Sequence, residues 1–162
     1  MITLLLGGAR SGKSELAEEL AAKAGTPVTY VATAAVGDDD FAVRVAAHVA
    51  RRPAGWNTVE CGDDLPGALR AAAGTVLVDS LGTWLARFRD FEVAADAVCE
   101  ALRTRNGDTV IVSEEVGLGV HPETDVGRAF RDALGALNRA VASVADDVLL
   151  VVAGRVLRLE EA

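Results

Sequence analysis

The feature that most constrains this chain is a glycine-rich octapeptide between two different hydrophobic patterns. An apolar run at residues 2–6 precedes it, and a segment with helical periodicity follows it. The octapeptide matches G-x-x-x-x-G-K-[ST], and its residues are Gly7, Gly8, Ala9, Arg10, Ser11, Gly12, Lys13 and Ser14. In this context the pattern is typical of a loop whose backbone N–H groups wrap phosphates. It predicts that the chain binds a nucleoside triphosphate, ATP or GTP.

The residue types in the loop also predict a Mg²⁺ site. Lys13 is expected to reach the β- and γ-phosphate oxygens, and Ser14 to ligate Mg²⁺. A carboxylate is expected nearby at the end of another apolar strand, and Asp79 follows the run at residues 75–78. An aspartate in that position is also common as a turn or helix cap, so Asp79 becomes a metal candidate only because the loop is present.

Apolar runs and helical stretches alternate along the chain. Strands are predicted at residues 2–6, 28–32, 75–78, 109–112 and 148–152, and helices at residues 13–24, 38–52, 65–73, 83–104 and 126–145. This order predicts an α/β fold of the P-loop NTPase type, with a mostly parallel sheet and helices on both faces. Residues 155–159 are expected to close a C-terminal antiparallel hairpin. Residues 1–162 should form a single nucleotide-binding catalytic domain, because no linker or repeat divides them.

The net charge, the lysine positions and the hydrophobic pattern argue against several classes of function. The formal net charge of -8 opposes binding to a nucleic acid. Lysine occurs only at positions 13 and 23, so the Asn-Lys-x-Asp motif of signalling GTPases is absent. No apolar run is long enough for a membrane span and no leader pattern is present, so we expect a cytoplasmic protein.

The predicted helix at residues 38–52 carries a histidine beside its apolar stripe. His48 has Arg44 one turn before it and further arginines after it. A neutral imidazole is a competent nucleophile near pH 7, and arginines bind phosphates. The same spacing also fits a histidine at the rim of a packing surface, and periodicity alone does not decide between them.

Several segments together resemble a known family. They are residues 7–14, 30–33, 44–48, 52–56, 78–81, 115–123 and 130–132. The combination is similar to the bifunctional adenosylcobinamide kinases and adenosylcobinamide-phosphate guanylyltransferases of cobalamin biosynthesis, over nearly the whole chain. The resemblance implies phosphorylation of adenosylcobinamide by ATP or GTP, followed by transfer of GMP from GTP to adenosylcobinamide phosphate.

The resemblance also implies site residues and assembly. His48 matches the histidine that carries GMP, and the nucleotide site would include Thr33, Arg52, Pro53, Ala54, Gly55, Glu60 and Asp79. A homo-oligomer, expected to be a trimer, is implied as well. Three features depart from the family pattern: Glu114 replaces a usual asparagine, Gly82 a frequent threonine, and the stretch 85–91 is short. His121 is interpreted as incidental.

Two other functions remain open from the residues alone. One is a kinase for another small metabolite, in which His48 is structural. The other is a regulatory nucleotide-binding ATPase without a metabolite substrate.

Overall fold

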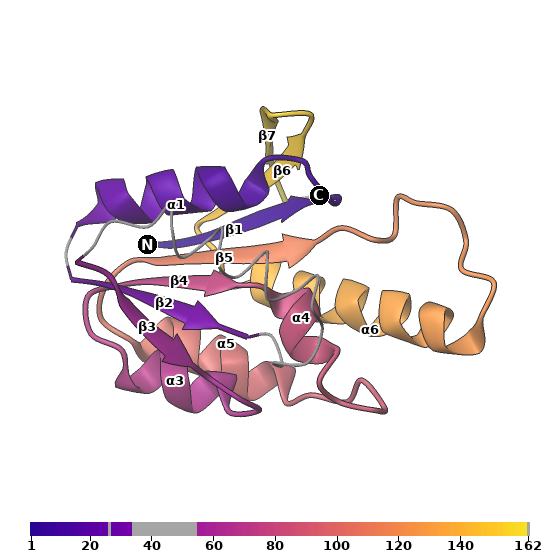
Figure 1. The fold of residues 1–162 in the computed structure, drawn as a ribbon, viewed down its shortest axis with the longest axis horizontal. Coiled ribbons are helices and arrows are strands. Elements are labelled where there is room, and N and C mark those ends of the chain that lie inside the picture. Colours follow the sequence, from indigo (N-terminus) through magenta and orange to yellow (C-terminus); the bar gives the residue numbers. More distant parts are fainter. Residues whose placement is uncertain (26, 34–54, 162) are drawn as a thin grey trace.

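The computed structural model describes residues 1–25, 27–33 and 55–161, and its centre is a seven-stranded sheet (Figure 1). The sheet order is β3-β2-β4-β5-β1-β6-β7, with every pair parallel except β6 and β7. The strands are β1 (Ile2–Gly7), β2 (Val28–Ala32), β3 (Asn57–Glu60), β4 (Thr75–Asp79), β5 (Thr109–Glu114), β6 (Asp147–Val152) and β7 (Arg155–Leu159). The predicted α/β fold with a C-terminal antiparallel hairpin is confirmed.

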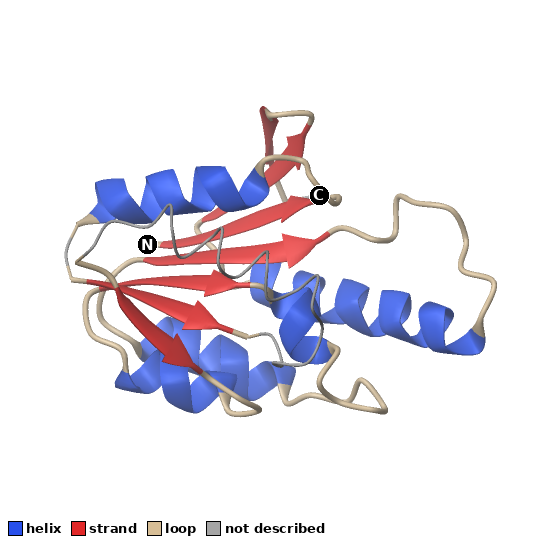
Figure 2. Ribbon diagram, in the orientation of Figure 1, coloured by secondary structure: helices blue, strands red, loops and turns tan. Residues whose placement is uncertain are grey.

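Helices cover both faces of this sheet, as Figure 2 shows. They are α1 (Lys13–Ala24), α3 (Leu65–Ala71), α4 (Leu81–Leu85), α5 (Ala95–Thr104) and α6 (Asp125–Ala142). In β1, Leu5 packs with α1 on one face, whereas Leu4 and Leu6 belong to the larger core shared with α3, α5 and α6. This alternation follows from the two-residue period of a strand, and it explains why β1 is apolar on both sides.

None of the helices in the described ranges has the length and apolar character that a bilayer span requires.

The helix predicted over residues 83–104 is wrong, because the structure forms two helices there. α4 ends at Leu85 and α5 begins at Ala95. Between them Phe91 has a φ of 56°, which no helix accommodates, and its ring packs edge-on against Phe130 of α6. The helical periodicity of this stretch is therefore misleading, because Phe91 packs against Phe130 from a segment that is not helical.

Strand β3 was not predicted from the sequence. Its four residues are all exposed and it lies at the edge of the sheet, paired only with β2 among the described strands. A short polar edge strand lacks the apolar run by which buried strands are recognised. The helix predicted at residues 38–52 lies outside the described residues.

Candidate nucleotide site

The phosphate loop lies at the carboxyl end of β1 and leads directly into α1 (Figure 1). The ammonium group of Lys13 donates to the carbonyl oxygen of Gly8 at 3.1 Å, and the residue is only 8% exposed. A lysine buried in this way costs free energy unless its charge is used, which is the case when phosphates occupy the loop. The structure thus places the ammonium group of Lys13 within the loop, and its contact with the phosphates stays a prediction.

Two residues of the loop have a left-handed backbone conformation. They are Arg10 and Gly12, with positive φ values of 55° and 96°, and such residues are common in turns whose N–H groups bind anions. Gly7 is required for a different reason. A Cβ on Gly7 would lie 2.6 Å from the carbonyl oxygen of Val151 and 2.7 Å from Oγ of Ser11. Gly7 therefore allows the close approach of β6, and Gly12 allows the turn.

Two other elements hold the loop from outside. Gly7 O accepts a hydrogen bond from Glu115 N at 3.1 Å, and Ser11 O accepts one from Gly154 N at 2.9 Å. The loop is thus fixed by the segment after β5 and by the β6–β7 turn. Oγ of Ser11 is buried without a hydrogen-bond partner among the described residues. Such a donor inside a loop built for anions fits a phosphate-binding role.

Asp79 is the last residue of β4, so it lies with the phosphate loop at the carboxyl ends of the strands. Strand β5 lies between β4 and β1. Oδ2 of Asp79 accepts a hydrogen bond from the hydroxyl of Tyr30 at 3.0 Å, which orients the carboxylate. No group of three or more His, Cys, Asp or Glu residues is arranged for a metal in the described ranges. A hydroxyl and a carboxylate are the kinds of ligand that Mg²⁺ takes beside a nucleotide, so Ser14 and Asp79 stay the predicted Mg²⁺ ligands.

The other predicted site residues fall into three groups. Thr33 is 1% exposed, and its Oγ1 donates to Ser80 O at 2.9 Å, so it adjoins Asp79 through the backbone. Glu60 is exposed at the end of β3, and Ala32 of β2 pairs with both Glu60 and Asp79. Gly55 precedes the amino end of β3, at the opposite edge of the sheet. Arg52, Pro53, Ala54 and His48 lie outside the described residues, and their roles stay predictions.

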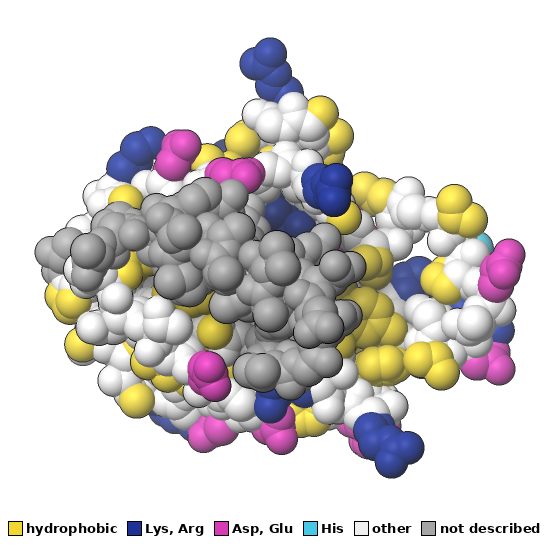
Figure 3. Space-filling model, in the orientation of Figure 1, with side chains coloured by type: hydrophobic (Ala, Val, Ile, Leu, Met, Phe, Trp, Pro, Cys, Tyr) yellow, Lys and Arg dark blue, Asp and Glu magenta, His cyan; other side chains and the backbone are white. Residues whose placement is uncertain are grey.

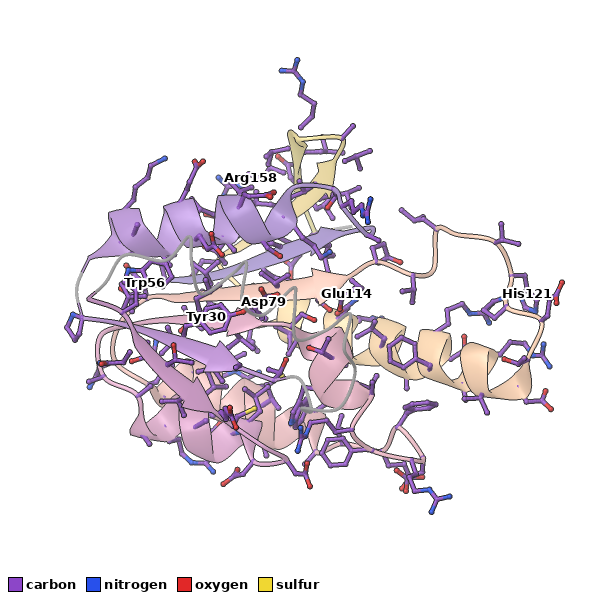
Figure 4. The ribbon with its side chains drawn as sticks, viewed as in Figure 1. Tyr30, Trp56, Asp79, Glu114, His121 and Arg158 are labelled. Atoms are coloured by element: carbon purple, nitrogen blue, oxygen red, sulfur yellow. The ribbon has the colours of Figure 1, made fainter. Side chains whose placement is uncertain are left out.

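The sequence did not predict that the hydroxyl groups of Thr33 and Ser80 link the carboxyl ends of β2, β4 and β5. Ser80 caps α4 in a capping box with Thr83, and its Oγ donates to the carboxylate of Glu114. Figure 4 shows Asp79 and Glu114 at the strand ends and Tyr30 within β2 on the side of Asp79, with His121 far from them on the loop before α6. His121 instead contacts Arg131, with Nη1 and Nδ1 2.8 Å apart. The pattern Asp-Ser-x-x-Thr was the only signal of the capping box.

Comparison with known proteins gives consistent results. A family model described as cobinamide kinase / cobinamide phosphate guanyltransferase matches residues 3–159. The chain is 42% identical over 163 residues to the bifunctional adenosylcobalamin biosynthesis protein CobP of Pseudomonas aeruginosa, covering 95% of this chain and 94% of that protein. It is 35% identical over 179 residues to the corresponding protein CobU of Salmonella typhimurium, covering 95% and 97%.

A solved structure supports the fold independently. It is that of a prototypical ATPase from the type III secretion system of pathogenic bacteria, with a TM-score of 0.58. The identity is 14%, over 92% of this chain and 50% of that one, so the likeness extends to the fold alone.

Proposed function

Since the chain belongs to the cobinamide kinase / cobinamide phosphate guanyltransferase family, we propose that it catalyses both reactions on adenosylcobinamide. It phosphorylates the aminopropanol hydroxyl with ATP or GTP, and it then transfers GMP from GTP to the new phosphate. The observation that carries this proposal is the phosphate loop, in which buried Lys13 lies inside a turn of positive φ at the end of β1.

In the kinase reaction the oxygen of the substrate hydroxyl forms a bond to the γ-phosphorus and releases its proton to water. The bond between the γ-phosphorus and the bridging oxygen breaks, and the nucleoside diphosphate leaves. The loop N–H groups and Lys13 bind the phosphates and stabilise the charge that develops on their oxygens. Ser14 and Asp79 would hold Mg²⁺, which supplies further charge neutralisation when bound. Tyr30 keeps the Asp79 carboxylate oriented for this role through its hydroxyl.

In the guanylyltransferase reaction His48 is the proposed nucleophile, by resemblance to the family. Neutral imidazole forms a bond to the α-phosphorus of GTP, and the bond to pyrophosphate breaks. An oxygen of the corrinoid phosphate then attacks the same phosphorus, and the bond to His48 breaks. The product is adenosylcobinamide-GDP, and the imidazole returns to its starting state.

The corrinoid is much larger than a nucleotide and needs an additional surface. The loop between β5 and α6 projects beyond the strand ends (Figure 1), and Leu118 and Val120 on it are 78% and 94% exposed. In Figure 3 apolar side chains gather between this projecting lobe and the middle of the molecule. Arg128 fixes the loop by donating to the carbonyl oxygens of Pro122 and Glu123, both at 2.9 Å. This surface suits an apolar ring system.

The proposal includes a homo-oligomer, a trimer by resemblance, in the cytoplasm. Edge strand β7 supports association, because its Val156 and Leu157 are 51% and 60% exposed. Light scattering coupled to size-exclusion chromatography measures the subunit number directly.

The deciding experiment uses the fact that the chain contains only two histidines. The wild type, His48→Ala and His121→Ala are incubated with Mg²⁺ and GTP labelled at the α-phosphorus, and the denatured chains are examined for acid-labile, base-stable label. We expect label on the wild type and on His121→Ala, and none on His48→Ala.

A second measurement follows γ-labelled ATP with adenosylcobinamide. Phosphate transfer without protein label would leave a kinase in which His48 is structural. Hydrolysis without either transfer would leave a regulatory ATPase.

A further inference from the structure

Glu114 occupies a central position at the phosphate-binding edge of the sheet. It is the last residue of β5, the strand between β1 with its phosphate loop and β4 with Asp79. In the parallel register Glu114 is paired with Gly7, the first residue of the loop. Its carboxylate oxygens lie 2.9 and 3.0 Å from Oγ of Ser80. A charged acceptor therefore holds the residue that directly follows Asp79.

Ser80 joins the ends of two further elements. Its N–H donates to Oγ1 of Thr33 at 2.8 Å, and its carbonyl oxygen accepts from the same hydroxyl at 2.9 Å. Its Oγ accepts from the N–H of Thr83 at 3.3 Å in the first turn of α4. Both Ser80 and Thr33 are almost fully buried. The polar groups of this turn are thus satisfied by a network that ends on the carboxylate of Glu114.

Gly82 has no backbone reason to be glycine. It lies within α4, where alanine is the better helix former, and its φ is not in the left-handed region. A Cβ at position 82, however, would lie 2.1 Å from Oε2 and 3.0 Å from Cδ of Glu114. The next nearest atom would be Cδ2 of Leu134, at 3.4 Å. The carboxylate of Glu114 therefore occupies the space that a Cβ at position 82 would fill.

We propose that Glu114 is a positioning residue of the phosphate-transfer site, and that Gly82 is glycine in order to admit its carboxylate. Through Ser80, Glu114 fixes the turn that carries Asp79 and thereby the carboxylate that faces the nucleotide. The inference rests on the proposed function, because it assigns Asp79 to nucleotide binding.

The experiment compares Glu114→Ala, Glu114→Gln, Gly82→Ala and the double variant Glu114→Ala/Gly82→Ala with the wild type. The readouts are Mg²⁺-dependent affinity for GDP, kcat and KM for kinase turnover, and the melting temperature. We expect Glu114→Ala to weaken Mg²⁺-dependent GDP binding by up to about tenfold, because the turn beside Asp79 loses a hydrogen bond to a charged group and binding must then order it. Glu114→Gln keeps an oxygen acceptor of the same size and should recover most of the affinity. Exposed Glu100 on α5 supplies a control, Glu100→Ala, that should match the wild type.

The double variant tests the role of Gly82. In the wild type, Gly82→Ala should displace the carboxylate and reproduce the loss of affinity. In the Glu114→Ala background the same substitution should leave the affinity unchanged and raise the melting temperature, because alanine favours the helix once the clash is gone.

Two results would overturn the inference. One is a Glu114→Ala protein with a lowered melting temperature but wild-type GDP affinity and kinetics, which would make Glu114 purely structural. The other is an equal loss from Gly82→Ala in both backgrounds. GDP binding needs no corrinoid, so failure of the proposed reactions in the wild type would be seen separately.

Discussion

The two halves of the nucleotide site are built in different ways. The phosphate loop is one continuous octapeptide, and the groups proposed to bind phosphate are its backbone N–H groups and Lys13. The opposite half is assembled from the ends of β2, β4 and β5, where hydrogen bonds link Thr33 and Glu114 to Ser80, the residue that directly follows Asp79. The loop depends on local backbone conformation, whereas this corner depends on the sheet order. Substitutions should therefore act differently in the two halves.

The largest effect is expected at Lys13. Lys13→Ala removes the buried ammonium group of the loop but leaves Arg10 and the glycines that shape it, so the fold should remain and both transfer reactions should fall by about a hundredfold or more. The only other lysine, Lys23, is an exposed partner of Glu19 on α1 and supplies the control Lys23→Ala. Labelled phosphate and GMP transfer measure the effect. Equal activity of the two variants would contradict the assignment of Lys13.

The next effect distinguishes two glycines of the loop. Gly7→Ala should lower the free energy of unfolding by about 1–3 kcal/mol, because its Cβ meets the backbone oxygen of Val151 at 2.6 Å. Gly8→Ala is the control, since a Cβ there has nothing within 4 Å. Urea denaturation of both variants measures the difference. Similar stability of the two would show that the β6 contact does not constrain the loop.

Asp79 tests the assembled half. Asp79→Asn keeps the size of the side chain but removes its charge, so Mg²⁺-dependent nucleotide affinity should fall about tenfold while affinity without Mg²⁺ stays near that of the wild type. Titration with a fluorescent GDP analogue, with Mg²⁺ or with EDTA, separates the two. If both affinities fall equally, Asp79 acts on the fold and not on the metal.

The smallest effect concerns Cys61, which follows β3 and donates its N–H to Ala32 O at 3.1 Å. Burial raises the pKa of the Cys61 thiol, and the charge of Arg87 opposes this only in part. The folded protein therefore keeps this proton at a pH where the unfolded chain loses it. Its contribution to the free energy of unfolding is therefore complete below the pKa of the unfolded thiol, about 8.5, and is lost as the pH rises through the higher pKa of the folded thiol.

Urea denaturation between about pH 8 and pH 10 tests this expectation. Cys61→Ala should show a smaller alkaline decline in the free energy of unfolding than the wild type. The other buried thiol, Cys99, also has a raised pKa, so part of the decline should remain in this variant. Identical profiles would remove Cys61 as a cause.

Much of the fold followed from the sequence. The strand predicted at residues 28–32 and the helix at residues 13–24 have the observed bounds, because one is a continuous apolar run and the other starts directly after a glycine of the loop. The errors came where contacts outweigh periodicity. The turn at Phe91 depends on Phe130, about 40 residues away, and β3 exists only because β2 offers it a hydrogen-bonding edge.

By itself, the sequence determined the phosphate loop, most of the buried strands and the helix that follows the loop, and the family. These depend on residues that are neighbours in the chain, where backbone sterics and side-chain periods act directly. Only the tertiary structure decided that Glu114 holds Ser80 and that Gly82 makes room for it. That arrangement requires β4 and β5 to lie side by side. Glu114 and Gly82 are far apart in the sequence, so no local sequence pattern predicts that the carboxylate of one lies against the backbone of the other.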